Sequence, residues 1–160
     1  ATPISPGQVL AGHLVWTALK IAGSGAVYVA LIALFGGVRS SGIVLSLLAA
    51  VVAGAAVAAL VAAFTAGVHD EGSAFNVLFR LVLIPMTLFS GTFFPVANLP
   101  VWVRPVTWAS PLWHGTELAR AAVLGGVAPV AALGHVAFLL ALLAAGTAVG
   151  VRRFRRRLHR

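Results

Sequence analysis

The chain has 160 residues, of which 61% are hydrophobic and 9% charged, and its mean hydropathy is +1.04. A soluble domain carries about 25% charged residues, so these few charges exclude an ordinary water-covered surface and predict a lipid-embedded chain. The formal net charge of +8 would suit nucleic acid, but six of the eleven Lys and Arg residues lie within residues 152–160. A basic cluster directly after an apolar run is typical of a cytoplasmic membrane flank. We therefore expect contact with membrane lipid and no nucleic-acid partner.

Four apolar runs predict four transmembrane helices, at residues 14–35, 43–66, 77–96 and 130–151. A spanning helix needs about 20 mostly apolar residues, and the runs lack the alternating pattern of membrane barrel strands. The expected fold class is therefore all-α, a polytopic transmembrane helix bundle that forms a single domain over residues 1–160. The third run is the weakest, because Arg80 interrupts it and Pro85 should kink it by removing a backbone N–H.

The segments between and beyond these runs differ in character. Residues 97–129 combine prolines with Trp102, Trp108 and Trp113, and tryptophan favours the membrane interface. This segment is predicted to form short interfacial or re-entrant helices in the outer leaflet. Residues 1–13 and the basic tail at 152–160 are predicted to lie in the cytoplasm.

The distribution of basic residues sets the predicted orientation. With both chain ends in the cytoplasm, eight basic residues face inward, namely Lys20, Arg80 and the six tail arginines. Three face outward, namely Arg39, Arg104 and Arg120. The positive-inside rule favours this arrangement. We expect a multi-pass protein of the plasma membrane with both ends of this chain cytoplasmic.

Small residues recur at four-residue spacing along the second run and predict a face for close helix packing. They are Ser46, Ala50, Gly54, Ala58, Ala62 and Ala66.

Two motifs carry a resemblance to a known family. The first is Phe89-Ser90-Gly91-Thr92-Phe93-Phe94-Pro95, followed by Asn98-Leu99-Pro100. The second is Trp108-Ala109-Ser110-Pro111-Leu112-Trp113-His114-Gly115-Thr116-Glu117-Leu118-Ala119-Arg120. Together they resemble the ABC-2 type exporter permeases, in the branch that contains drug-resistance permeases and lipo-oligosaccharide exporters. The opening Thr2-Pro3-Ile4-Ser5-Pro6 is similar to the family's cytoplasmic segment before its third helix.

The resemblance implies a six-helix membrane subunit, of which this chain would be the C-terminal portion with helices three to six. It also implies two partners, a second permease subunit and a cytoplasmic ATP-binding-cassette subunit. The chain lacks a Gly-x-x-x-x-Gly-Lys-Ser/Thr phosphate loop, and its only lysine is Lys20, so we expect ATP and Mg²⁺ on the partner and no cofactor on this chain. The implied function is export of an amphipathic or lipid-like substrate such as a drug, glycolipid or lipo-oligosaccharide.

The resemblance also nominates site residues. Residues 2–10 would dock the ATPase; the coupling candidates are Thr2, Pro3, Ile4, Ser5 and Pro6. The alternative is an ordinary helix start, stiffened by proline and capped by serine. The candidates for an extracytoplasmic gate or substrate contact are Phe93, Phe94, Trp113, His114, Glu117 and Arg120.

The gate candidates have plainer interpretations. Glu117 and Arg120 are spaced for pairing on one helix face, so they serve either a gate or the stability of an interfacial helix. His114 and Glu117 offer a metal only two ligands on one turn, and we expect no metal site. His135 lies within the fourth run, where an ionisable side chain is either functional or hydrogen-bonded inside the bundle.

Two other classes of function compete with the exporter interpretation. An intramembrane enzyme would need a nucleophile or a metal constellation, but the chain has no cysteine and only three acidic residues, and it lacks the His-Glu-x-x-His and Gly-x-Ser-x-Gly motifs. We therefore expect no enzyme activity. A non-catalytic membrane scaffold or assembly protein stays open on the sequence. An ATP-binding-cassette gene beside this one would favour the exporter.

Overall fold

The computed structural model describes residues 5–38, 40–68, 71–125 and 128–158, and these residues form helices joined by turns, without a strand. The elements in chain order are α1 (Pro6–Leu34), α2 (Gly42–Thr65), α3 (Glu71–Val77), η1 (Leu78–Leu83), α4 (Ile84–Leu88), η2 (Val96–Asn98), α5 (Arg104–Trp108), α6 (Pro111–Leu124) and α7 (Pro129–Leu158). The predicted all-α, polytopic helix bundle is confirmed.

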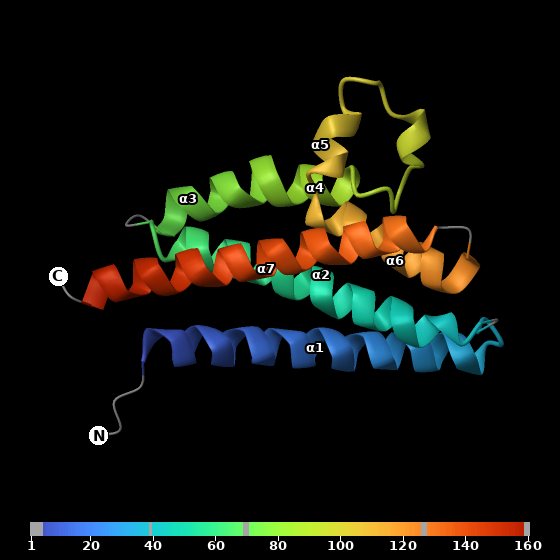
Figure 1. The fold of residues 1–160 in the computed structure, drawn as a ribbon, viewed down its shortest axis with the longest axis horizontal. Coiled ribbons are helices and arrows are strands. Elements are labelled where there is room, and N and C mark those ends of the chain that lie inside the picture. Colours follow the sequence, from blue (N-terminus) through green and yellow to red (C-terminus); the bar gives the residue numbers. More distant parts are fainter. Residues whose placement is uncertain (1–4, 39, 69–70, 126–127, 159–160) are drawn as a thin grey trace.

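The long helices lie along one common direction. Figure 1 shows α1, α2 and α7 running lengthwise, with α3 and α4 on one side of them and the α5 region projecting beyond α4. The start of α1 and the end of α7 lie at the same end of the bundle (Figure 1). The α6 helix lies beside α7 at the opposite end, so the two sequence motifs are carried far from the termini.

Within the described ranges, three helices are long and apolar enough to cross a membrane, over Pro6–Leu34, Gly42–Thr65 and Pro129–Arg156. The predicted span at 77–96 differs, because the apolar helix there covers Gly72–Leu88 and is shorter. It starts earlier than expected, at Glu71 in α3, and ends at Leu88, before a turn in which Gly91 has a φ of +81°. This left-handed backbone favours glycine and cannot continue a right-handed helix. The number of four spans stays a prediction.

The expected distortion around Pro85 takes the form of a π-helical segment. η1 comes directly before the proline in α4, and the backbone N–H of Ile84 donates to the carbonyl of Phe79. Pro85 has no N–H for the carbonyl one turn earlier, and wider hydrogen-bonded turns are one way a helix adjusts at such a point.

The first helix begins at Pro6, well before the predicted residue 14. Ser5 caps it through a reciprocal pair of hydrogen bonds: its hydroxyl accepts from the backbone N–H of Gln8, and the Gln8 side chain accepts from the backbone N–H of Ser5. This capping box satisfies donors that a helix start leaves free, and Pro6 suits the first helical position.

The last helix includes most of the basic tail. α7 continues to Leu158, beyond the predicted span at 130–151, so the described part of the basic tail extends the same helix. Arg153 donates from Nη1 to the carbonyl oxygen of Ala63 at 2.9 Å. A cation near the C-terminal end of α2 satisfies a carbonyl and complements the helix dipole.

The tightest packing lies between α2 and the pair α6 and α7. Alanines dominate the buried face of α2, namely Ala49, Ala53, Ala56, Ala59 and Ala63. Ala53 and Ala56 pack with the fully buried Leu139 of α7. Small residues let helix backbones approach closely, which is the main means of association in lipid.

The predicted ridge on α2 is therefore not its most buried face. Its central Gly54 packs against Ile21 of α1, where an added Cβ would meet the isoleucine side chain. Ala50 is exposed beside the same helix. At Gly54 the ridge packs against α1, a helix that leaves large side chains uncovered: Trp16 is 62% exposed and Tyr28 67%.

Candidate functional site

The two sequence motifs meet at the end of the bundle opposite the termini. The turn after α4 is closed by Ser90, whose Oγ lies 2.8 Å from both the Thr87 carbonyl oxygen and Thr92 Oγ1. Thr92 Oγ1 in turn lies 3.3 Å from Thr116 Oγ1 on α6. These hydroxyls join the turn of the first motif to the helix of the second.

Arg120 provides the second link. Its Nη2 donates to the carbonyl oxygen of Gly91 at 2.9 Å, and its Nη1 donates to Glu117 Oε1 at 2.5 Å. The expected Glu117–Arg120 pair is thus present, and the guanidinium also bridges α6 to the Gly91 turn. Gly91 also lies close to its neighbours, since an added Cβ would be 3.3 Å from a Val96 methyl carbon and 3.4 Å from the Trp113 ring, but its positive φ is what requires glycine.

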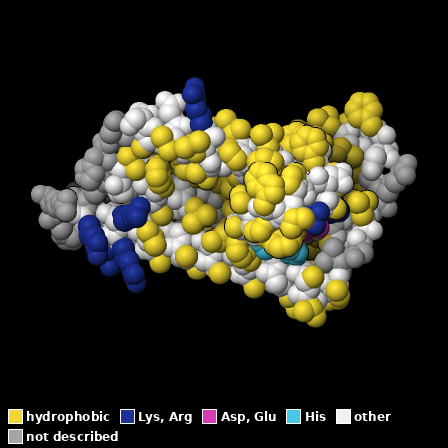
Figure 2. All heavy atoms as spheres, turned by 90° about the horizontal axis from the view of Figure 1, so that it is seen from above, with side chains coloured by type: hydrophobic (Ala, Val, Ile, Leu, Met, Phe, Trp, Pro, Cys, Tyr) yellow, Lys and Arg dark blue, Asp and Glu magenta, His cyan; other side chains and the backbone are white. Residues whose placement is uncertain are grey.

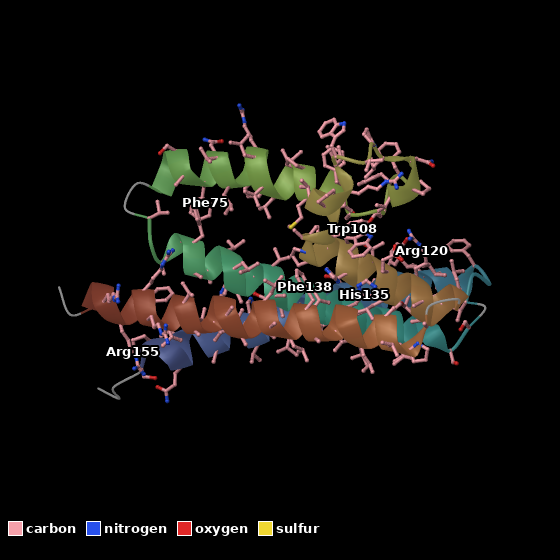
Figure 3. The ribbon with its side chains drawn as sticks, turned by 45° about the horizontal axis from the view of Figure 1, so that its top comes forward. Phe75, Trp108, Arg120, His135, Phe138 and Arg155 are labelled. Carbon is pink, nitrogen blue, oxygen red and sulfur yellow. The ribbon has the colours of Figure 1, made fainter. Side chains whose placement is uncertain are left out.

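A histidine pair lies on the other side of α6. His114 Nδ1 is 2.7 Å from His135 Nδ1 on α7, and His114 Nε2 is 2.9 Å from the carbonyl oxygen of Trp108. Figure 3 shows His135 and Phe138 on α7, with Trp108 and Arg120 nearby. His135 is therefore hydrogen-bonded inside the bundle, as one of its two interpretations held.

Aromatic rings enclose the pair. The His114 ring stacks on Phe138 with centroids 3.9 Å apart, and Trp113 contacts the edges of both imidazoles. Burial lowers the pKa of His114, against the hydrogen bond to Trp108, which raises it; the charge of His135 lowers the pKa further. Burial in apolar surroundings disfavours the imidazolium form, so His114 is held neutral.

The gate candidates fall into two groups. Trp113, His114, Glu117 and Arg120 lie together on α6 as described, whereas Phe93 and Phe94 project from the turn and are 61% and 56% exposed. Arg104 holds the neighbouring segment by donating to the carbonyl oxygens of Leu99 and Ala97. Figure 2 shows a mostly hydrophobic face of the molecule, with acidic and histidine side chains in one half and several basic side chains gathered towards the opposite end.

Two of the coupling candidates, Ser5 and Pro6, lie at the far end of the bundle. Ser5 and Pro6 form the capped start of α1, while Thr2, Pro3 and Ile4 lie outside the described residues. No group of three or more possible metal-ligating side chains is found among the residues the structure describes.

The sequence could not reveal the histidine pair. His114 and His135 are 21 residues apart on different helices, and no helical periodicity connects them. The only signal was that an ionisable residue within an apolar run needs a partner.

Comparison with known families decides the relationship. The family model described as ABC-2 type transporter matches residues 1–124. The chain belongs to the ABC-2 type transporter family. The match includes both motifs and all the gate and coupling candidates. The chain is accordingly a multi-pass membrane protein of a family of transport subunits, in agreement with its apolar helices.

Individual relatives support the same assignment. This ABC-2 family chain is 32% identical over 126 residues to nodulation protein J of Rhizobium leguminosarum bv. viciae, covering 78% of the chain and 48% of the relative. It is 31% identical over 132 residues to nodulation protein J of Sinorhizobium fredii (strain NBRC 101917 / NGR234), covering 79% and 50%. The chain thus spans about half the length of these relatives.

A further relative matches over a shorter stretch. The probable multidrug ABC transporter permease YbhR of Escherichia coli (strain K12) is 40% identical over 38 residues, which is 24% of this chain and 10% of that protein. No solved structure matches the chain.

Proposed function

We propose that the chain is part of the permease subunit of an ATP-binding-cassette exporter that moves an amphipathic or lipid-like substrate out of the cytoplasm. The family match over residues 1–124 carries the proposal. The chain would work with a second permease subunit and with a cytoplasmic ATPase subunit that binds ATP and Mg²⁺. Both ends of this chain would then lie in the cytoplasm.

The capped start of α1 supports coupling to an ATPase. A coupling element must transmit force, which requires a stiff start. The Ser5–Gln8 capping box and Pro6 at the first position provide that stiffness, and α1 then runs without interruption to Leu34. Movement of Ser5 would therefore be carried along the helix to the opposite end of the bundle.

The α6 end supports an exit for amphipathic cargo. The turn that bears Phe93 and Phe94 is tied to α6 through Arg120 and Thr116. Aromatic side chains that are exposed beside a fixed polar group suit a molecule with one apolar and one polar part. Glu117 and Arg120 would contact the polar part as it leaves.

Co-purification tests the partner. The protein is expressed with an ATP-binding-cassette subunit encoded beside its gene, purified, and reconstituted in liposomes. Co-purification with ATP hydrolysis that rises on adding substrate supports the proposal; a stable membrane protein that binds no ATPase and stimulates none would favour a scaffold instead.

Two matched substitutions test the coupling segment. Pro6→Gly loosens the start of α1, and Pro129→Gly makes the same change at the start of α7, at the other end of the bundle. We expect Pro6→Gly to lower stimulated ATP hydrolysis and Pro129→Gly to leave it nearly unchanged. Equal effects of the two would contradict a coupling role for Ser5 and Pro6.

Export assays test the substrate class. Liposomes that contain both subunits are given a lipophilic dye or a small hydrophilic sugar together with ATP. Faster export of the dye is expected; faster export of the sugar would contradict the proposed cargo.

A further inference from the structure

An apolar cavity lies between α2 and the helix formed by α3, η1 and α4. Its volume is about 360 Å³, and its wall includes residues of α2, of the π-helical segment, of α4 and of α5. Ligand cavities of this size, lined mainly by apolar side chains with a few polar groups, are typical of small-molecule sites. The π-helical segment supplies Leu78, Leu81, Val82 and Leu83 to the wall, and such segments occur frequently at functional sites.

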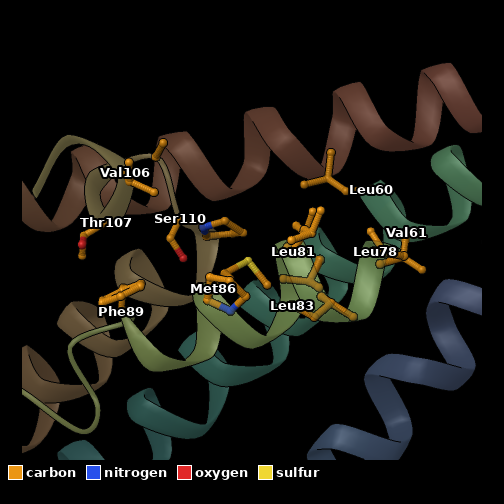
Figure 4. A pocket seen from close by; sticks show the side chains of 15 residues that line it. Leu60, Val61, Leu78, Leu81, Leu83, Met86, Phe89, Val106, Thr107 and Ser110 are labelled. Carbon is orange, nitrogen blue, oxygen red and sulfur yellow. The ribbon is translucent and has the colours of Figure 1, made fainter. Parts of the chain in front are cut away.

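Two hydroxyl groups at the cavity have no hydrogen-bond partner in the part of the chain that the structure describes. Thr107 is fully buried and Ser110 is 6% exposed, and neither side-chain oxygen has a hydrogen-bond partner among the described residues. Both residues line the cavity. Figure 4 shows them towards the end near Phe89 and Met86, away from Leu60, Val61 and Leu78.

A buried hydroxyl without a partner is costly, and the native protein has local alternatives that it does not use. Ser110 precedes α6 but makes no side-chain capping bond. Thr87, Thr116 and Thr147 all donate to a carbonyl one turn earlier, whereas Thr107 does not. The two free hydroxyls therefore point to a polar group supplied from outside the chain.

We propose that this cavity binds a single-chain amphiphile. Its aliphatic chain lies along the leucine-rich wall, and its ester, amide or hydroxyl head forms hydrogen bonds with Thr107 and Ser110. Leu78 and Phe89 are eleven residues apart along the wall helix, which corresponds to roughly 16 Å at the helical rise. A wall of this length, with Thr107 and Ser110 towards one end and apolar side chains along the rest, fits an extended chain better than a compact solute.

The inference rests on the proposed function only in taking the amphiphile to be exported cargo. The head group lies near α5 and Ser110, next to the α6 end where the proposed exit lies. The head would then leave Thr107 and Ser110 and pass to the Phe93 and Phe94 turn as the cargo is released. The cavity lies within one chain, so it would act in addition to any transport path that the two permease subunits form together.

Met86 makes the test specific. It is the only methionine in the chain, and it lines the cavity. The protein is labelled at the methionine methyl group and placed in nanodiscs of deuterated phospholipid; Met86→Leu identifies the signal. Monolaurin, which has one acyl chain and a glycerol head, is the probe, and dodecane supplies a chain without a head.

We expect monolaurin to shift the Met86 signal saturably and to give magnetisation transfer between its chain and the Met86 methyl group. Dodecane should bind about tenfold more weakly, the effect of one or two lost hydrogen bonds. The double variant Thr107→Val, Ser110→Ala should bind both probes equally. Thr147→Val, which removes a hydroxyl elsewhere, should keep the preference for monolaurin.

Several outcomes would overturn the proposal. One is equal affinity of the unsubstituted protein for the two probes. Another is magnetisation transfer from protonated phospholipid chains in place of monolaurin, which would make the cavity a bilayer-lipid site. Val57→Phe, which fills the cavity from α2, should abolish the shift while the thermal unfolding transition is retained; a persistent shift would place the probe elsewhere. Because this assay measures binding without ATP, its result is independent of the export and ATPase assays.

Discussion

His114 on α6 and His135 on α7 face each other through their Nδ1 atoms at 2.7 Å, and this contact fixes the proton positions in both rings. The Trp108 carbonyl oxygen can only accept, so His114 Nε2 carries a proton and donates to it. In the neutral ring, His114 Nδ1 is then the acceptor. His135 must therefore donate from Nδ1, and protonation of His114 Nδ1 would place two donors against each other.

This geometry predicts a loss of stability in mild acid. The pKa of His114 in the folded protein is lowered, chiefly by burial, so the unfolded chain binds a proton more readily. Stability should be full above about pH 6.5, the ordinary histidine value, and should fall as the pH drops towards the lowered pKa. Thermal unfolding in detergent between about pH 5 and pH 8 measures it.

Two matched variants test whether His114 causes this dependence of stability on pH. His114→Gln should flatten the pH dependence, whereas His13→Gln, which changes an exposed histidine on α1, should leave it in place. The groups that face the His114 ring are His135 on α7 and the carbonyl of Trp108. Glu117 and Arg120 lie one to two turns further along α6. An unchanged pH profile in His114→Gln would refute the assignment.

Arg120→Ala should loosen the Gly91 turn. The variant loses the bond to the Gly91 carbonyl and the pair with Glu117, and because the side chain is 41% exposed we expect a loss of only about 1 kcal/mol in the free energy of unfolding. Amide hydrogen exchange at Gly91 and Thr92 should accelerate. Glu117→Gln keeps the bond to Gly91 and is the control; if it accelerates exchange as much, the bridge to Gly91 is unimportant.

Gly146→Ala should weaken the contact between α2 and α7. An added Cβ would lie 2.8 Å from the Ala59 carbonyl carbon and 2.9 Å from the Leu60 nitrogen. Backbone atoms cannot turn away as a flexible side chain does, so we expect a cost of about 1–3 kcal/mol in thermal or denaturant unfolding.

Gly134→Ala on the same helix is the control, because nothing lies within 4 Å of its added Cβ. It should raise stability by up to about 1 kcal/mol through helix propensity. Similar destabilisation by both substitutions would mean that the close approach of α2 and α7 is absent in the membrane.

Thr107→Val should stabilise the ligand-free protein. The substitution keeps the side-chain shape and removes a fully buried hydroxyl that has no partner. We expect a gain of about 1 kcal/mol in unfolding measured without amphiphile. Thr147→Val removes a hydroxyl that is bonded to the Leu143 carbonyl and should give no gain. A destabilised Thr107→Val would show that the Thr107 hydroxyl has a partner in the folded protein.

The helical class, the long apolar helices and the Glu117–Arg120 pair followed from composition and spacing, because each depends on near neighbours in sequence. The early end of the third helix could not be predicted in this way. The sequence stays hydrophobic through Phe89 and Phe93, whereas the positive φ of Gly91 turns the backbone out of the helical path. The buried face of α2 was also missed, because a helix that is apolar all round shows no preferred side.

Contacts between distant residues were beyond sequence reasoning. The pairing of His114 with His135, and the bond from Arg120 to Gly91 across 29 residues, exist only once the helices pack. The cavity at Met86 and Thr107 likewise forms between elements that no single-sequence pattern joins.

The orientation of the chain is the claim on which the proposed function most depends, and the absence of cysteine makes it directly measurable. Single substitutions Ser5→Cys, Trp102→Cys and Arg155→Cys place a thiol at exposed positions at the two ends of the bundle. A membrane-impermeant maleimide applied to intact cells should label Trp102→Cys alone, and all three after permeabilisation. Labelling of Ser5→Cys or Arg155→Cys in intact cells would put a chain end on the side away from ATP and would contradict the account.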